Sequence, residues 1–201
     1  MVNRARPPKA VFLDRDGTLN HDPGYLRRAE DVRLFDEVGP ALRLLKDHDF
    51  RLIVVSNQSG VSRGLLDLEE LSRIEAQIQI ALSAFDVTID GFEYCTHKPE
   101  EECACRKPHP LLIERRAERD GIDLMQSVMV GDRATDLQAG HRAGCGRVAL
   151  VRTGEGTRTE QEGLLSDFSP SVCWVGDHLL DVSRWIVQGI VQGPVQASPS
   201  N

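Results

Sequence analysis

The chain is predicted to adopt an α/β fold, a doubly wound parallel sheet with helices on both faces. Short apolar runs alternate with segments of helical period along most of the sequence. The runs are rich in β-branched residues and continuously apolar, as in strands that are buried on both faces. Polar clusters directly follow four of the runs, and ligands of such sheets bind beyond the carboxyl ends of the strands.

The first half of the chain predicts two strands and two helices. Residues 9–13 (KAVFL) form a β-branched and aromatic run, and residues 51–56 (RLIVVS) form a second continuous apolar run. Between them, apolar residues at 38, 41, 42 and 45 share one face of a helix. Asp67, with a glutamate three residues later, is a helix start, and an apolar stripe continues from it to Phe85.

The second half continues the alternation with four strands and three helices. Residues 91–95 (GFEYC) are a weaker strand candidate, and Pro110 is expected in the first turn of the next helix. The other expected elements are a helix to about Asp120, strands over 127–130, 147–151 and 171–175, and helices over 135–143 and 179–187. Residues 1–187 are therefore expected to form a single domain, followed by a mobile tail over 188–201.

Composition excludes several classes of protein. The chain has 201 residues and a formal net charge of −7, which disfavours nonspecific binding to nucleic acid. No apolar run approaches the roughly 18 residues of a membrane span. The N-terminus lacks the apolar stretch of a secretory signal, so a cytoplasmic location is expected. Five cysteines, an odd number, make a disulfide framework improbable and direct attention to metal binding.

An acidic motif follows the first expected strand. Asp14 and Asp16 lie two residues apart, and in extended backbone both side chains would face the same side. Gly17 permits a tight turn immediately afterwards. Such a motif is either an acidic turn or a nucleophilic carboxylate beside an acid/base carboxylate, holding a divalent cation.

Together with three other motifs, this segment resembles the haloacid dehalogenase superfamily of phosphotransferases, whose first motif is D-x-D-G-T. Ser56 matches the serine or threonine at the end of the second strand, Lys107 matches the lysine, and Gly131-Asp132-x-x-x-Asp136 matches the fourth motif. The resemblance implies a Rossmann-like core. The short segments between the motifs leave no room for a cap domain, so a capless enzyme with an open crevice is expected.

The resemblance also implies the chemistry of the site. Asp14 would attack phosphorus and form an aspartyl-phosphate, and Asp16 would serve as acid and then as base. Mg²⁺ would be held by Asp14, the backbone carbonyl of Asp16, and Asp132. Lys107 and Ser56 would bind phosphate oxygens. Asp136 would orient Lys107 or a metal-bound water. Taken singly, the serine could simply end a strand, the lysine could be a surface charge, and Asp132 and Asp136 could cap a helix.

A cysteine-rich loop lies between the second and fourth motifs. Cys95, His97, Cys103 and Cys105 supply three thiols and an imidazole, the ligand set of a structural Zn²⁺ site. From composition alone, the alternative is a run of free thiols with a surface histidine. The loop resembles that of the zinc-bearing subfamily of heptose bisphosphate and histidinol-phosphate phosphatases, which implies Zn²⁺ bound by these four residues.

The subfamily resemblance implies a small phosphorylated sugar as substrate. The chain is expected to act as a monomer. The expected reaction is removal of the 7-phosphate of D-glycero-D-manno-heptose 1,7-bisphosphate, and the alternatives are histidinol phosphate or another small sugar phosphate. Arg106 would clamp the retained phosphate bidentately, or else pair with the glutamates at 100–102. The implied phosphate and substrate contacts are Asp22, Gly24, Tyr25, Ser56, Asn57, Gln58, Ser59, Arg106, Lys107 and Arg133.

Two classes of protein compete with this interpretation. A phosphoryl-accepting receiver domain carries an acidic pair, a serine or threonine and a lysine on a similar sheet, but it does not turn over phosphate esters. A noncatalytic zinc-dependent interaction protein would need only the cysteine loop. The presence of both Asp14 and Asp16 argues against each of them.

Overall fold

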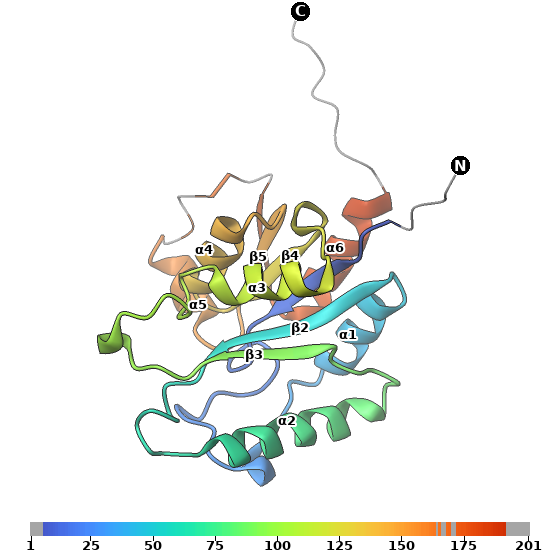
Figure 1. The fold of residues 1–201 in the computed structure, drawn as a ribbon. Helices are drawn as coiled ribbons and strands as arrows, with labels where there is room; N and C mark the ends of the chain where they lie inside the picture. The colour runs from blue at the N-terminus through green and yellow to red at the C-terminus, as the bar shows by residue number, and fades with distance from the viewer. Residues whose placement is uncertain (1–5, 164, 166–167, 170–171, 192–201) are drawn as a thin grey trace, which may run out of the picture.

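The sheet of this protein has six parallel strands in the order β3-β2-β1-β4-β5-β6. The computed structural model describes residues 6–163, 165, 168–169 and 172–191 (Figure 1). The strands are β1 (Lys9–Leu13), β2 (Phe50–Asn57), β3 (Gly91–Cys95), β4 (Val128–Gly131), β5 (Arg147–Val151) and β6 (Cys173–Gly176). Strand order reverses between β1 and β4, so a crevice is expected at their carboxyl ends. The predicted α/β class is confirmed.

Helices cover both faces of the sheet, as Figure 1 shows. One apolar cluster packs α1, α2 and α6 against one face, and a second packs α3 and α4 against the other. The helices are α1 (Val38–Lys46), α2 (Leu68–Ser83), α3 (Leu111–Asp120), α4 (Ala134–Ala143), α5 (Gly156–Gln161) and α6 (Leu179–Val191). Three short 3-10 segments are η1 (Ala29–Asp31), η2 (Pro99–Glu101) and η3 (Leu124–Gln126).

Most predicted elements occur within one or two residues of their expected bounds. The carboxylate of Asp67 caps α2 by accepting a hydrogen bond of 2.7 Å from the backbone N–H of Glu70. Phe85, expected on the stripe of that helix, lies beyond its end and packs on Gly39, where a Cβ would be 2.4 Å from the phenyl ring. Helix α5 was not predicted, because six residues containing glycine and two threonines have little helix propensity.

The C-terminal boundary differs from the prediction. Helix α6 runs to Val191, so the first four residues of the expected tail, from Gln188, are helical. Gly189, within the expected tail, lies inside the helix, where a Cβ would be 2.3 Å from a guanidinium nitrogen of Arg147. The absence of a side chain at Gly189 therefore leaves room for the Arg147 guanidinium, which extends from β5. Residues 192–201 lie outside the described residues.

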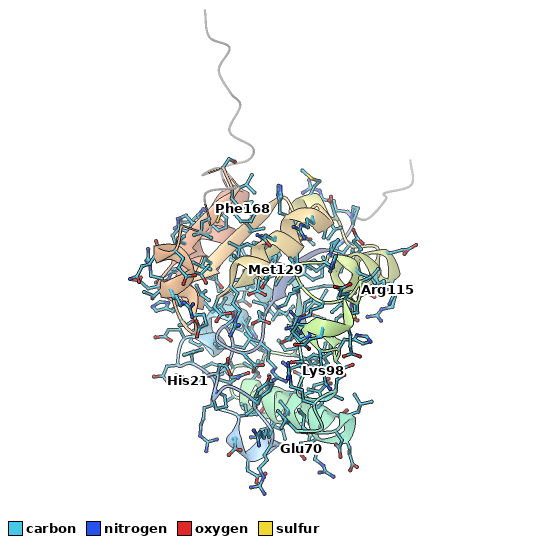
Figure 2. The ribbon with its side chains drawn as sticks, turned by 90° about the vertical axis from the view of Figure 1, so that its left-hand side faces the viewer. His21, Glu70, Lys98, Arg115, Met129 and Phe168 are labelled. Carbon is cyan, nitrogen blue, oxygen red and sulfur yellow. The ribbon has the colours of Figure 1, made fainter. Side chains whose placement is uncertain are left out.

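No separate domain interrupts the sheet within residues 6–163, which the structure describes. The β1–β2 connection holds only η1 and α1, and the β2–β3 connection holds only α2. The side chains fill the space between the layers, with fully buried Met129 near the middle (Figure 2). Over the described ranges, each helix is too short or too polar to cross a membrane.

Candidate active site

The carboxyl ends of β1, β2 and β4 and the segments that follow β3 and β5 contribute to one cavity of about 630 Å³. Parallel strands end at the same edge of the sheet, so residues distant in sequence meet there. Asp132 lies beneath the cavity, 1% exposed. Every other residue expected at the site lines it: Asp14, Asp16, Asp22, Gly24, Tyr25, Ser56, Asn57, Gln58, Ser59, Arg106, Lys107, Arg133 and Asp136.

The Lys107 ammonium group lies between two carboxylates at the floor of the cavity. Its Nζ donates to Asp14 Oδ1 at 2.6 Å and lies 2.7 Å from Asp136 Oδ1. It also donates to the backbone carbonyl of Val55, at 2.7 Å. The other Asp136 oxygen accepts from the Arg133 backbone N–H at 3.0 Å. Asp136 therefore both caps α4 and holds the lysine, which combines the two roles considered from the sequence.

Three buried carboxylates at this floor, those of Asp14, Asp132 and Asp136, can bring ligand atoms within 4.8 Å of one another. When ionised they carry three negative charges, against one positive charge on Lys107. The Asp132 Oδ1 atom is buried and has no hydrogen-bond partner among the described residues. Burying such an atom is costly unless it is paired or coordinates a metal. A divalent cation with oxygen ligands, such as Mg²⁺, fits this donor set.

A segment after β5 holds Asp132 in place. The Glu155 backbone N–H donates to Asp132 Oδ2 at 2.8 Å, and Thr159 Oγ1 donates to the Asp132 carbonyl at 2.9 Å. Thr153 Oγ1 donates to the Gly17 carbonyl at 2.6 Å. Sequence reasoning missed this support, although the position of the segment directly after β5 could have indicated it.

Gly17 allows the first motif to approach Asp132. Its φ of +86° lies in the left-handed region, and a Cβ there would be 2.2 Å from Asp132 Oδ2. The sequence predicted only a tight turn at this glycine. Close packing against the carboxylate is a second reason why a side chain is excluded.

The Asp16 carboxylate lines the same cavity but has different partners. Arg15 donates to both of its oxygens, from Nε at 2.9 Å and from Nη2 at 2.7 Å. Asn20 donates to Oδ1 at 3.0 Å, and Gln58 donates to Oδ2 at 2.8 Å. Burial raises the pKa of Asp16, but the Arg15 guanidinium and the other donors outweigh it and hold that pKa below its usual value.

The four zinc-type ligands expected from the sequence lie together in the loop that precedes Arg106. Cys95 Sγ is 3.4 Å from Cys103 Sγ, and Cys105 Sγ is 3.6 Å from Cys103 Sγ. The His97 Nδ1 atom is 3.3 Å from Cys105 Sγ. Ligands about 2.3 Å from a tetrahedral Zn²⁺ would be roughly 3.8 Å apart, so the donor set fits such an ion.

Several substrate contacts expected from the sequence have protein partners. The side-chain amide of Asn57 pairs with the Lys107 backbone, accepting from its N–H at 3.0 Å and donating to its carbonyl at 3.2 Å. Arg133 faces Asp22 across the mouth, with 3.7 Å between Nη2 and Oδ2. Arg106 donates to the His97 carbonyl at 3.4 Å. Among described residues, Arg106 has no ion-pair partner, which removes the proposed pairing with the glutamates at 100–102.

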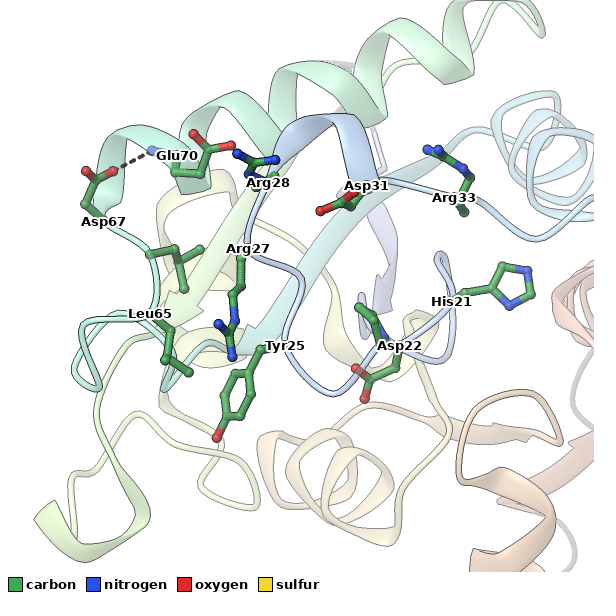
Figure 3. Close-up of a pocket in the computed structure, with 12 residues that line it drawn as sticks. His21, Asp22, Tyr25, Arg27, Arg28, Asp31, Arg33, Leu65, Asp67 and Glu70 are labelled. Carbon is green, nitrogen blue, oxygen red and sulfur yellow. Dashed lines mark hydrogen bonds between the residues drawn. The ribbon is translucent and has the colours of Figure 1, made fainter.

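A second pocket of about 690 Å³ lies along the loop that contains Asp22 and Tyr25 (Figure 3). The Arg27 side chain extends toward the Tyr25 ring in this pocket, which mixes arginines with carboxylates. Asp22 and Tyr25 line both cavities. The loop is therefore a wall of the crevice with open space on each side.

Comparison with known proteins gives close matches over most of the chain. It is 40% identical to the D-glycero-beta-D-manno-heptose-1,7-bisphosphate 7-phosphatase of Haemophilus ducreyi over 161 residues, covering 77% of this chain and 88% of that one. It is 36% identical to the Escherichia coli K12 protein of the same name over 189 residues, covering 90% and 95% of the two chains. The chain belongs to this phosphatase family.

Structural comparison agrees with that assignment. A family model described as HAD-hydrolase-like matches residues 104–182 of the phosphatase. The D,D-heptose 1,7-bisphosphate phosphatase from B. bronchiseptica, solved with magnesium and phosphate, superposes with a TM-score of 0.82 and 33% identity. The match covers 90% of this chain and 98% of that chain. The resemblance to the haloacid dehalogenase superfamily is therefore confirmed.

The buried carboxylates predict a distinctive pH dependence of stability in magnesium-free buffer. Burial is the main cause that raises the pKa of Asp14 from 3.8 to about 6, and burial with the neighbouring carboxylates raises that of Asp132 to about 8. A carboxyl group with a raised folded-state pKa binds its proton more tightly when folded, so stability falls as pH rises between the unfolded and folded values. We expect the melting temperature of the phosphatase to fall between about pH 4 and pH 8.

Thermal melts at each pH, with and without Mg²⁺, check this expectation. Asp132→Asn should flatten the slope above pH 6, because it removes the carboxyl with the higher pKa. Added Mg²⁺ should stabilise the unsubstituted phosphatase more at pH 8 than at pH 5, since it binds the ionised carboxylates. A magnesium-free melting temperature that rises from pH 5 to pH 8 would contradict the expectation.

Proposed function

We propose that this protein is a magnesium-dependent phosphatase that removes the 7-phosphate of D-glycero-β-D-manno-heptose 1,7-bisphosphate, acting as a monomer in the cytoplasm. The identity with phosphatases named for that substrate over most of the chain carries the proposal. The converging carboxylates, lysine and arginines of the crevice support it with a chemistry suited to phosphate esters.

Hydrolysis proceeds in two steps on the side chains of this crevice. In the first, an Asp14 carboxylate oxygen attacks phosphorus while Asp16, protonated once the negatively charged phosphate is bound beside it, gives its proton to the leaving oxygen as the bond from that oxygen to phosphorus breaks. In the second, Asp16 takes a proton from the water that attacks the aspartyl-phosphate, which releases inorganic phosphate. Lys107 and the Ser56 hydroxyl stabilise the phosphoryl oxygens during both transfers.

The two metals have different roles in this proposal. Asp14, Asp132 and the Asp16 backbone carbonyl would hold Mg²⁺, which offsets negative charge on the phosphoryl group when bound. Cys95, His97, Cys103 and Cys105 would hold a structural Zn²⁺, because four protein ligands complete its tetrahedral shell. The zinc loop leads directly into Arg106 and Lys107, so its role is to fix the positions of these two side chains.

A bisphosphate substrate accounts for the arginines of the cavity wall. The phosphate that reacts occupies the floor near Asp14, and a second phosphate requires a separate positive group. Arg106 and Arg133 line the cavity, and no ion-pair partner of Arg106 occurs in the described part of the chain. A guanidinium fork binds a phosphate bidentately, which favours a substrate that keeps a phosphate at its far end.

The deciding experiment compares kcat/KM for three substrates: heptose 1,7-bisphosphate, heptose 7-phosphate and histidinol phosphate. The bisphosphate should exceed both others by about 10- to 100-fold, the effect of a charge-assisted contact of roughly 1.5–3 kcal/mol. Arg106→Met should remove most of the advantage over the 7-phosphate. Faster turnover of histidinol phosphate would replace the proposed substrate with that amino alcohol ester.

A further inference from the structure

Arg15, between the two aspartates of the first motif, has a buried guanidinium dedicated to one of them. The residue is fully buried, with 0% exposure. Among the described residues, Asp16 is its one ion-pair partner, and the guanidinium lies over the Tyr94 ring at 6.0 Å. A buried arginine is costly unless its charge is paired, so this contact constrains both side chains.

Four hydrogen bonds fix the orientation of the Asp16 carboxylate. Arg15 supplies two of them in a fork, and Asn20 and Gln58 supply one to each oxygen. Gln58 also accepts from Arg15 Nη2 at 2.9 Å and donates to Ser56 Oγ at 2.9 Å. The side chain of Asp16 keeps 20% exposure toward the cavity. Its carboxylate is therefore locked in one orientation while part of it still faces substrate.

We propose that Arg15 is a positioning residue that aims the Asp16 carboxylate at the leaving oxygen and, through Gln58, holds it in register with Ser56. The inference rests on the proposed phosphatase function and extends it to a group that does not touch the substrate. In the first step the bond from phosphorus to Asp14 forms and the ester bond breaks. Asp16 is ionised in the free crevice, so it first binds a proton when the negative charge of the substrate phosphate lies beside it, and that proton passes to the departing oxygen.

The role of Arg15 depends on the leaving group. An alkoxide leaving from a sugar needs a proton as the bond breaks, so misorientation of Asp16 slows that step. A p-nitrophenolate ion is stable without a proton at neutral pH, so its departure does not depend on Asp16. In the second step every substrate gives the same aspartyl-phosphate, whose hydrolysis needs Asp16 as base. If Asp16 loses its orientation, kcat/KM should therefore fall for the sugar ester and not for the aryl ester. Hydrolysis of the aspartyl-phosphate, the second step, should slow for both substrates.

The test measures kcat/KM of Arg15→Lys and Arg15→Met with heptose 1,7-bisphosphate and with p-nitrophenyl phosphate. General acid catalysis contributes about 10²–10⁴-fold, so the sugar ester should lose at least about 30-fold while the aryl ester stays within about 3-fold. Slowed hydrolysis of the aspartyl-phosphate should also give a burst of p-nitrophenolate in rapid mixing. Asn20→Ala, which removes another donor to the same carboxylate, should show the same selectivity in weaker form.

Arg116→Met is the matched control, since Arg116 is a buried arginine paired with Glu93 and Asp120 away from the crevice. It should lower the melting temperature without changing the ratio of the two kcat/KM values. Equal losses for both esters in the folded Arg15 and Asn20 variants, or no loss for either, would overturn the inference. Absence of turnover by the unsubstituted protein with both esters would instead reject the proposed function.

Discussion

Asp14→Asn is expected to lower kcat by at least about 10⁴-fold, the largest loss of activity from a single substitution in this chain. The amide has no carboxylate oxygen that can attack phosphorus, so the aspartyl-phosphate cannot form and the two-step route is closed. Measurement of Mg²⁺-dependent phosphate release from heptose 1,7-bisphosphate tests this directly. Survival of more than about 1% of the turnover would show that the nucleophile lies elsewhere.

Stability separates this loss from misfolding. The Asp14 carboxylate is buried, and burial raises its pKa to about 6. A neutral amide of the same shape should therefore leave the melting temperature unchanged or raise it in magnesium-free buffer near pH 8. Asp36→Asn, the same exchange at an exposed aspartate that does not line the cavity, should keep full activity. The same pair of variants distinguishes an enzyme from a receiver domain or a noncatalytic zinc protein.

Local patterns predicted the backbone of this site, because strands and their ends leave strong signals in a sequence. Apolar runs located β1 and β4 within a residue or two, and the polar residues that follow them, Asp14 and Asp132, meet at the reversal of strand order. The cysteine loop was equally visible, since its ligands are close in sequence. Site residues that lie at strand ends can therefore be predicted from a single sequence, because the strands themselves can be located from it.

Side-chain partners across the fold were harder to predict. Asn57 lines the cavity, and its expected contact with substrate stays a prediction, but its amide also pairs with the Lys107 backbone 50 residues away. Nothing in the local sequence indicates this second contact, because it depends on where the loop after β3 returns. Thr159, in a six-residue helix whose propensity signal is weak, and Glu155, the residue before that helix, support Asp132. The sequence predicted no role for Arg15, because its full burial beside Asp16 is visible only in the structure.

Loss of the zinc-type site is expected to have the second largest effect, on stability and activity together. The loop from His97 to Cys105 holds one 3-10 turn, and three of the four ligand residues are only partly buried, so few apolar contacts fix their positions. A structural Zn²⁺ contributes its binding free energy to folding. Cys105→Ser should therefore cost several kcal/mol and lower the melting temperature by about 10 °C.

Activity should fall with stability because Arg106 and Lys107 directly follow the last ligand, Cys105. Chelation followed by excess Mg²⁺ should reproduce the loss, and added Zn²⁺ should restore it in the unsubstituted chain but not in Cys105→Ser. Elemental analysis should give about one zinc per chain. Cys173→Ser is the matched control, since that partly exposed thiol lies outside the cluster. If zinc removal left both melting temperature and kcat unchanged, the contacts of Lys107 with Val55, Asn57, Asp14 and Asp136 would be enough to hold it, and the loop would have no part in positioning it.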